Sequence, residues 1–139
     1  MAGYSGKPLA DKLGLQHGQR AGWVGLPASL SALPLSRSFA RSDLVARCRD
    51  LAPGPFDMIH VFTMSRAMLE SDLDTALGRL ARDGMIWVSW PKKAAKLPTD
   101  VTEDVVRGLA LEGPLVDVKV CAVDAIWSGL KLVIRTELR

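Results

Sequence analysis

The run Met85–Trp90 (MIWVSW) constrains the fold more than any other stretch of this sequence. Its one polar residue is Ser89, so both faces of an extended chain would be apolar here. Strands of this kind occur in parallel sheets that are covered on both sides. Pro91 has no amide hydrogen to give to a neighbouring strand, so we expect the strand to end there. The run therefore predicts an α/β fold built around a buried strand.

A second apolar segment, 56–62 (FDMIHVF), predicts the neighbouring strand. Ser65 is a suitable N-cap for a helix between the two strands. The apolar stripe of that helix is Leu69, Leu73, Ala76, Leu77 and Leu80. A strand–helix–strand unit joins parallel neighbours through a right-handed connection. We interpret His60, inside strand 56–62, as a packed or edge residue and not as a ligand.

The segment after the central strand predicts a basic loop and then a helix. Residues 92–98 hold three lysines and a proline, which is typical of a loop. Thr99 and Asp100 both suit an N-cap, and Asp100 has capping-box spacing to Glu103. We therefore expect Asp100 to be the N-cap. Residues 113–114 (GP) should end the helix.

The last part of the chain predicts an antiparallel hairpin. In 115–123 (LVDVKVCAV), one face holds Val116, Val118, Val120 and Ala122, and the other holds Asp117 and Lys119. This alternation is typical of a half-exposed strand. Residues 124–129 predict a turn-like connector, and residues 130–136 predict the second strand of the hairpin.

The first part of the chain is less regular. Residues 8–13 predict a short helix, and 20–25 predict the first strand. From 28 to 51 the pattern is poor, with a weakly helical segment at 43–51. The sequence APGP at 52–55 is a strong break.

Composition limits the classes of protein. The 139 residues, of which 48% are hydrophobic, suit a single globular domain, 1–139. No apolar run approaches the roughly 20 residues that span a bilayer. The first residues do not resemble a signal peptide. We therefore expect a cytoplasmic protein with no membrane partner.

Charge and cysteine content exclude further classes. The net charge is +3, and residues 20–49 hold five arginines against one acid, Asp43. Few aromatic residues, Trp23 and Phe39, interleave with these arginines, so nucleic acid is an unexpected partner. Cys48 and Cys121 are far apart and lack metal-site spacing. We interpret them as buried free thiols and expect no metal site.

The order of these elements resembles the carboxy-terminal half of the Rossmann-like methyltransferase fold. FDMIHVF with Ser65, and RDGMIWVSWPKK, are similar to its fourth and fifth strands, and LGLQHGQRAGWVG is similar to the approach to its first strand. More closely, the chain resembles a small bacterial family of unknown function with this topology. The matching stretches are GYSGKPLADKLGL, WVSWPKK, TDVTEDVVR and VDVKVCAVDAIWSGLKLV. The resemblance implies a truncated, three-layer Rossmann-like fold whose mostly parallel sheet ends in an antiparallel hairpin, and it implies no established activity.

The chain departs from methyltransferases at the cofactor turn. Methyltransferases that bind S-adenosylmethionine need a glycine-rich turn after the first strand, where backbone approaches the ligand closely. Here the turn is VGLPASLSAL, with Gly25 alone and Pro27 behind it. No clear strand ending in Asp or Glu follows to bind a ribose. We therefore expect a degenerate cofactor site and no bound cofactor.

Candidate ligand-binding residues lie where the parallel strands end, because open α/β sheets bind ligands beyond these ends. A possible ligand or partner surface there comprises Gly25, Ser65, Arg66, Trp90 and Trp127. Structural packing is the alternative interpretation of Trp127. Lys92, Lys93 and Thr99 form a candidate anion site, since they precede a helix amino terminus. The carboxylates of Asp100 and Glu103 should weaken it.

Three hypotheses of function follow. The first is a non-catalytic binding or interaction module on a degenerate methyltransferase-like fold. The second is a methyltransferase with an altered cofactor turn. The third is an anion or nucleic-acid binder that uses the Arg and Lys surface. No Ser/His/Asp arrangement is visible, so we assign no catalytic residue.

Overall fold

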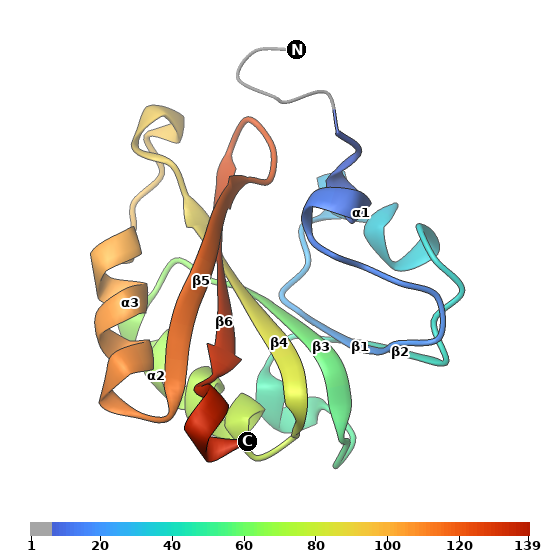
Figure 1. The fold of residues 1–139 in the computed structure, drawn as a ribbon. Helices are drawn as coiled ribbons and strands as arrows, with labels where there is room; N and C mark the ends of the chain where they lie inside the picture. Colours follow the sequence, from blue (N-terminus) through green and yellow to red (C-terminus); the bar gives the residue numbers. More distant parts are fainter. Residues whose placement is uncertain (1–6) are drawn as a thin grey trace.

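The computed structural model describes residues 7–139, which form a six-stranded sheet with helices on both faces (Figure 1). The strands are β1 (Arg20–Val24), β2 (Arg41–Val45), β3 (Phe56–Phe62), β4 (Leu80–Pro91), β5 (Leu115–Ala122) and β6 (Trp127–Ile134). The α-helices are α1 (Leu9–Lys12), α2 (Arg66–Leu77) and α3 (Glu103–Glu112). Short 3-10 helices are η1 (Ala28–Leu30), η2 (Leu33–Leu35), η3 (Cys48–Asp50), η4 (Lys93–Ala95) and η5 (Thr136–Leu138).

The sheet has the strand order β2-β1-β3-β4-β6-β5. The first four strands in this order are parallel, and β6 pairs antiparallel with both β4 and β5. The prediction of a three-layer, Rossmann-like sheet that ends in an antiparallel hairpin is confirmed. Strand β4 ends at Pro91, as its missing amide hydrogen predicts.

Each face of the sheet carries its own apolar core. Helices α2 and α3 cover one face, where their side chains pack on Ile59, Val88 and Leu130. Helix α1 and the segment with η1 and η2 cover the other face, where they pack on Trp23 and Trp87 (Figure 1). This double cover explains why β4 is apolar on both sides.

The centre of the second face is a row of aromatic side chains. Trp23, His60 and Trp87 are aligned across β1, β3 and β4 and are fully buried. The indole N–H of Trp87 donates to the carbonyl oxygen of Leu13 at 2.9 Å, which fastens the end of α1 to the sheet. His60 Nε2 lies 2.8 Å from Ser89 Oγ. His60 is therefore a packed residue, as expected.

The expected weak helix at 43–51 was wrong. Residues 41–45 form β2, and only 48–50 are helical, as η3. Strand β2 is largely exposed, so its apolar pattern is weak. It forms because β1 offers five residues of free edge for parallel pairing.

The expected face of β5 was also wrong. Val118 and Val120 are 53% and 49% exposed, whereas Leu115 and Cys121 are buried. The pairing with β6 shifts register between Asp117 and Lys119. A bulge of this kind adds one residue, so the alternation changes face halfway along the strand.

Other expectations concern the whole chain. No helix among residues 7–139 is long and apolar enough to cross a membrane. The cytoplasmic location stays a prediction. Cys48 and Cys121 are buried free thiols, as expected, and burial raises the pKa of Cys48 to about 12. Residues 3–6 (GYSG), which contribute to the family resemblance, lie outside the described residues.

The buried His60 predicts a pH-dependent stability. Burial lowers the pKa of His60 to about 3, from an ordinary value near 6.5. Below pH 6.5 the unfolded chain therefore binds a proton that the folded chain does not bind. The free energy of unfolding should fall as the pH drops from 6.5 to 4.5, by up to about 1.4 kcal/mol per pH unit. Urea titrations at several pH values measure this slope.

One variant makes the slope attributable to a single residue. His60→Gln should remove most of it. A wild-type protein with constant stability over this pH range would contradict the prediction.

Candidate functional site

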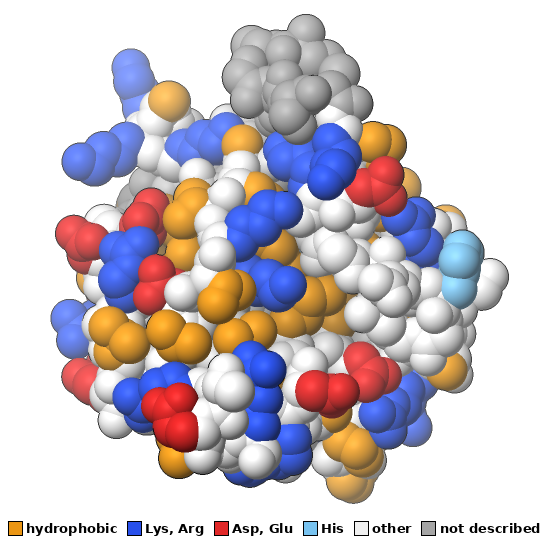
Figure 2. Space-filling model, in the orientation of Figure 1, with side chains coloured by type: hydrophobic (Ala, Val, Ile, Leu, Met, Phe, Trp, Pro, Cys, Tyr) orange, Lys and Arg blue, Asp and Glu red, His pale blue; other side chains and the backbone are white. Residues whose placement is uncertain are grey.

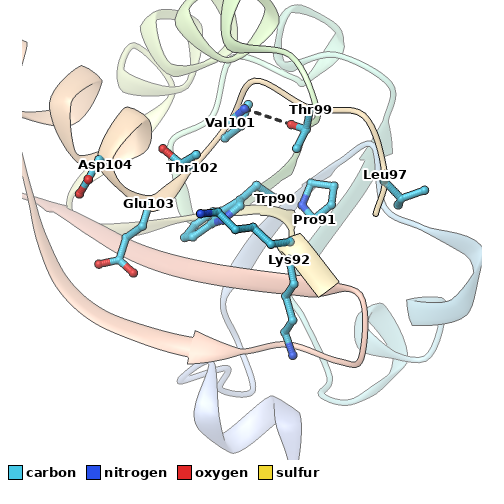
Figure 3. A pocket seen from close by; sticks show the side chains of 10 residues that line it. Trp90, Pro91, Lys92, Leu97, Thr99, Val101, Thr102, Glu103 and Asp104 are labelled. Carbon is cyan, nitrogen blue, oxygen red and sulfur yellow. Dashed lines mark hydrogen bonds between the residues drawn. The ribbon is translucent and has the colours of Figure 1, made fainter. Parts of the chain in front are cut away.

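An open groove of about 670 Å³ lies at the carboxyl end of β4, between the lysine loop (92–98) and the start of α3. Its lining residues are Trp90, Pro91, Lys92, Lys93, Leu97, Thr99, Val101, Thr102, Glu103 and Asp104. Figure 3 shows Trp90 at the centre, with Leu97 on one side and Glu103 and Asp104 on the other. Hollows of about 290 Å³ between α2 and α3, and of about 310 Å³ near Asp57, are smaller.

Trp90 forms the apolar floor of the groove. It is the next-to-last residue of β4 and lies on the face covered by α2 and α3. Its position near the strand end confirms the prediction from Pro91. Lys92 directly follows the last residue of β4, Pro91, and its amide N–H donates to the carbonyl oxygen of Ile126 at 2.7 Å. This bond fixes the start of the lysine loop to the β5–β6 hairpin.

The start of α3 differs from the prediction. Thr102 is the N-cap, and its hydroxyl accepts the amide N–H of Val105 at 3.2 Å. Asp100 instead accepts the amide N–H of Arg66 at 2.7 Å and so satisfies the first turn of α2. The N-cap prediction for Asp100 was therefore wrong, because a second helix amino terminus, remote in sequence, lies beside it.

Thr99 lines the groove, but its hydroxyl is already in use. It donates to the carbonyl oxygen of Met64 at 2.8 Å. It also accepts the amide N–H of Val101 at 3.0 Å (Figure 3). The hydroxyl of Thr102 is engaged as a cap. The other groups that the groove presents are charged side chains and the apolar floor.

The charges of the groove are unequally compensated. Arg107 contacts Glu103 at 2.5 Å, Asp104 at 3.1 Å and, on β5, Asp117 at 3.0 Å. Its hydrogen bonds to Glu103 and then to Asp117, which accept them, raise the pKa of this guanidinium. One guanidinium therefore forms ion pairs with three carboxylates.

The lysines of the loop carry the opposite charge. No ion pair among residues 7–139 includes Lys92 or Lys93. Lys92 is half-buried and Lys93 is exposed. Figure 2 shows basic side chains projecting at the corner of the molecule where the loop lies. Within the described residues, no group of His, Cys, Asp and Glu is arranged to hold a metal ion.

Four other candidate residues lie outside this groove. Ser65 caps α2 by accepting the amide N–H of Met68 at 3.3 Å, and Arg66 begins that helix. Trp127 is the first residue of β6 rather than part of the connector, and its ring meets that of Phe62 edge-on at 5.4 Å. Gly25 lies at the end of β1. The groove thus brings together Trp90 and the three residues of the candidate anion site, whose ligand-binding role stays a prediction.

Sequence reasoning did not single out Leu97, Val101, Thr102 or Asp104 as residues of the groove. A usable signal was the order Thr102-Glu103-Asp104, in which a threonine N-cap precedes two acids. It was missed because Asp100 offered an equally good cap.

Gly25, in the turn after β1, is exposed, but its backbone leaves no room for a side chain. Its φ is +67°, and its amide N–H donates to the carbonyl oxygen of Val45 at 2.9 Å. A Cβ at this position would lie 3.0 Å from the carbonyl oxygen of Phe62. The glycine therefore serves the packing of β1 against β2 and β3.

The segments beyond this turn also differ from the expected cofactor site. Only η1 and η2 lie between β1 and β2. A strand does follow, contrary to expectation, but β2 is followed by Ala46 and Arg47 and not by an acid. Asp43 lies within β2, where its hydrogen bond from Arg41 holds the pKa of its carboxyl below the ordinary value.

Comparison with known proteins shows the fold. No family model and no curated protein sequence matches this chain. The chain is similar in structure to a SAM dependent methyltransferase from Aquifex aeolicus, with a TM-score of 0.67 and 13% identity over 91% of this chain and 87% of that one. It is also similar to the N-methyltransferase NodS from Bradyrhizobium japonicum (TM-score 0.61, 13% identity, 91% and 90% covered).

A third similar structure is magnesium protoporphyrin IX methyltransferase from Synechocystis, with bound SAM (TM-score 0.65, 11% identity, 91% and 74% covered). The chain therefore has a methyltransferase-like Rossmann fold. Membership of a bacterial family of unknown function stays a prediction.

Gly25 should be intolerant of a side chain. Gly25→Ala combines a left-handed backbone with a contact to the Phe62 carbonyl, so it should lower the free energy of unfolding by about 1–2 kcal/mol. Gly108→Ala is the matched control, because Gly108 lies in α3 with open space around it. The control should raise stability by roughly 0.5–1 kcal/mol. Urea unfolding of both variants tests the assignment, which fails if Gly25→Ala is as stable as wild type.

Proposed function

We propose that this chain is a non-catalytic module that binds a small anionic ligand in the groove at the carboxyl end of β4. The observation that carries the proposal is the position of Lys92 and Lys93. They lie in a groove at the end of a central parallel strand, where sheets of this class bind ligands, and no described acid pairs with them. Trp90 supplies an apolar floor against which a ligand packs.

The geometry of the first turn supports a role without S-adenosylmethionine. Gly25 packs against the end of β3, and Pro27 lacks an amide hydrogen. No acid stands directly after the end of β2. A single glycine, a proline and no adjacent acid differ from the glycine-rich turn and the ribose partner that the cofactor needs, which supports the proposal.

A methyltransferase with an altered cofactor turn is the second candidate. The similarity of the fold to methyltransferases with bound SAM favours it. An enzyme of this kind would have to hold its cofactor by contacts other than a glycine-rich turn.

A nucleic-acid binder is the third candidate, and the arginine pairing disfavours it. Four of the five arginines between residues 20 and 49 form ion pairs with aspartates. Their charge is thereby partly neutralised, which leaves a poor surface for a polyanion.

The test of the proposal uses inorganic phosphate and hexanoate as anionic probes at low salt. We expect millimolar binding, seen as shifts of the Trp90 indole resonance in NMR titrations. Lys92→Ala/Lys93→Ala should weaken it at least tenfold, or about 1.4 kcal/mol. Lys131→Ala, beside the separate hollow near Asp57, is the control and should bind like wild type. Lysine-independent binding, or none, contradicts the proposal.

The methyltransferase alternative has its own measurement. Calorimetric titration with S-adenosylmethionine should show no micromolar binding. Micromolar binding that survives in the Lys92→Ala/Lys93→Ala variant would favour the enzyme over the binding module.

A further inference from the structure

The groove at the end of β4 presents opposite charges from two different elements. Lys92 and Lys93 come from the loop after β4, and Glu103 and Asp104 come from the first turn of α3. The ammonium group of neither lysine forms an ion pair with a described carboxylate, so the basic and acidic sides of the groove are not paired with one another. The space between them is part of the groove.

The acidic side carries more carboxylates than cations. Arg107 is the one cation paired with Glu103, Asp104 and Asp117 in the described part of the chain, so carboxylates exceed cations there. Asp104 is 96% exposed, which leaves it accessible to a second cation. The basic side has no described carboxylate partner at all. Each side therefore attracts a ligand group of opposite sign.

Apolar side chains form part of the surface between the charges. They are Trp90, Leu97 and Val101, of which Leu97 is the most exposed. The hydroxyls of Thr99 and Thr102 are occupied by backbone partners. A ligand that spans the groove therefore gains from an uncharged, apolar middle.

From these three observations we infer that the ligand is zwitterionic. Its carboxylate or phosphate group lies beside Lys92 and Lys93, its ammonium group lies beside Glu103 and Asp104, and its apolar middle lies on Trp90. The inference rests on the proposed function and narrows it. The same carboxylates that weaken the binding of a simple anion favour the binding of an amino acid or a short peptide over that of a polyanion.

Three probes of equal length separate the charges. They are 6-aminohexanoate, which carries both charges, hexanoate, which carries the anion alone, and hexylamine, which carries the cation alone. NMR titration of the full chain at low salt, followed by the Trp90 indole resonance, gives each dissociation constant. We expect 6-aminohexanoate to bind at least tenfold more tightly than either single-charge probe.

Two double variants assign each end of the ligand. Glu103→Gln/Asp104→Asn should abolish the advantage of 6-aminohexanoate over hexanoate and leave hexanoate binding intact or stronger. Lys92→Met/Lys93→Met should abolish the tighter binding of 6-aminohexanoate relative to hexylamine. Glu70→Gln/Asp74→Asn removes two carboxylates from the hollow between α2 and α3 and should change nothing. Circular dichroism and urea unfolding confirm that each variant is folded.

The outcomes separate this inference from the proposed function. Equal binding of hexanoate and 6-aminohexanoate by wild type overturns the zwitterion and keeps the anion site. Tightest binding of hexylamine, or no binding of any probe, overturns both. Loss of the preference in the Glu70→Gln/Asp74→Asn control would place the cation partner elsewhere and overturn the inference.

Discussion

The parallel pairing of β3 with β4 is the constraint on which the rest of the structure depends. Both strands are covered on both faces, so their backbone groups have no access to water and must pair with one another or with the next strands. The register places His60 beside Trp87 and Phe62 beside Ser89, which aligns the aromatic row of one face. Strands β1 and β6 then extend the sheet on either side.

The groove follows from how the chain leaves this pair. Three contacts hold the segment between β4 and α3: Lys92 to Ile126, Thr99 to Met64, and Asp100 to Arg66. They join it to the hairpin, to the end of β3 and to the start of α2. These three contacts are made to different elements at the carboxyl end of the parallel strands. The segment is therefore held open, and the lysines do not pair with the acids of α3.

The same fold supports many functions, and the site decides among them. Similarity to methyltransferases establishes the arrangement of strands and helices. At the first turn, however, Gly25 is followed by Pro27 and by no second glycine, whereas a cofactor turn is rich in glycine. The open space is instead at the end of β4, where charged side chains and a tryptophan are available.

The sequence by itself determined the elements whose signals are local. The apolar runs 56–62 and 85–90 became adjacent parallel strands, and Ser65 became the cap of α2, because burial and capping depend on residues a few positions apart. The tertiary structure alone decided β2, the bulge in β5 and the partner of Asp100. Each of these depends on a hydrogen-bond partner remote in sequence: the free edge of β1, the register with β6, and the amide N–H of Arg66. The position of the lysines could therefore be predicted from the sequence. The position of the acids across the groove depends on how α3 packs in the folded structure.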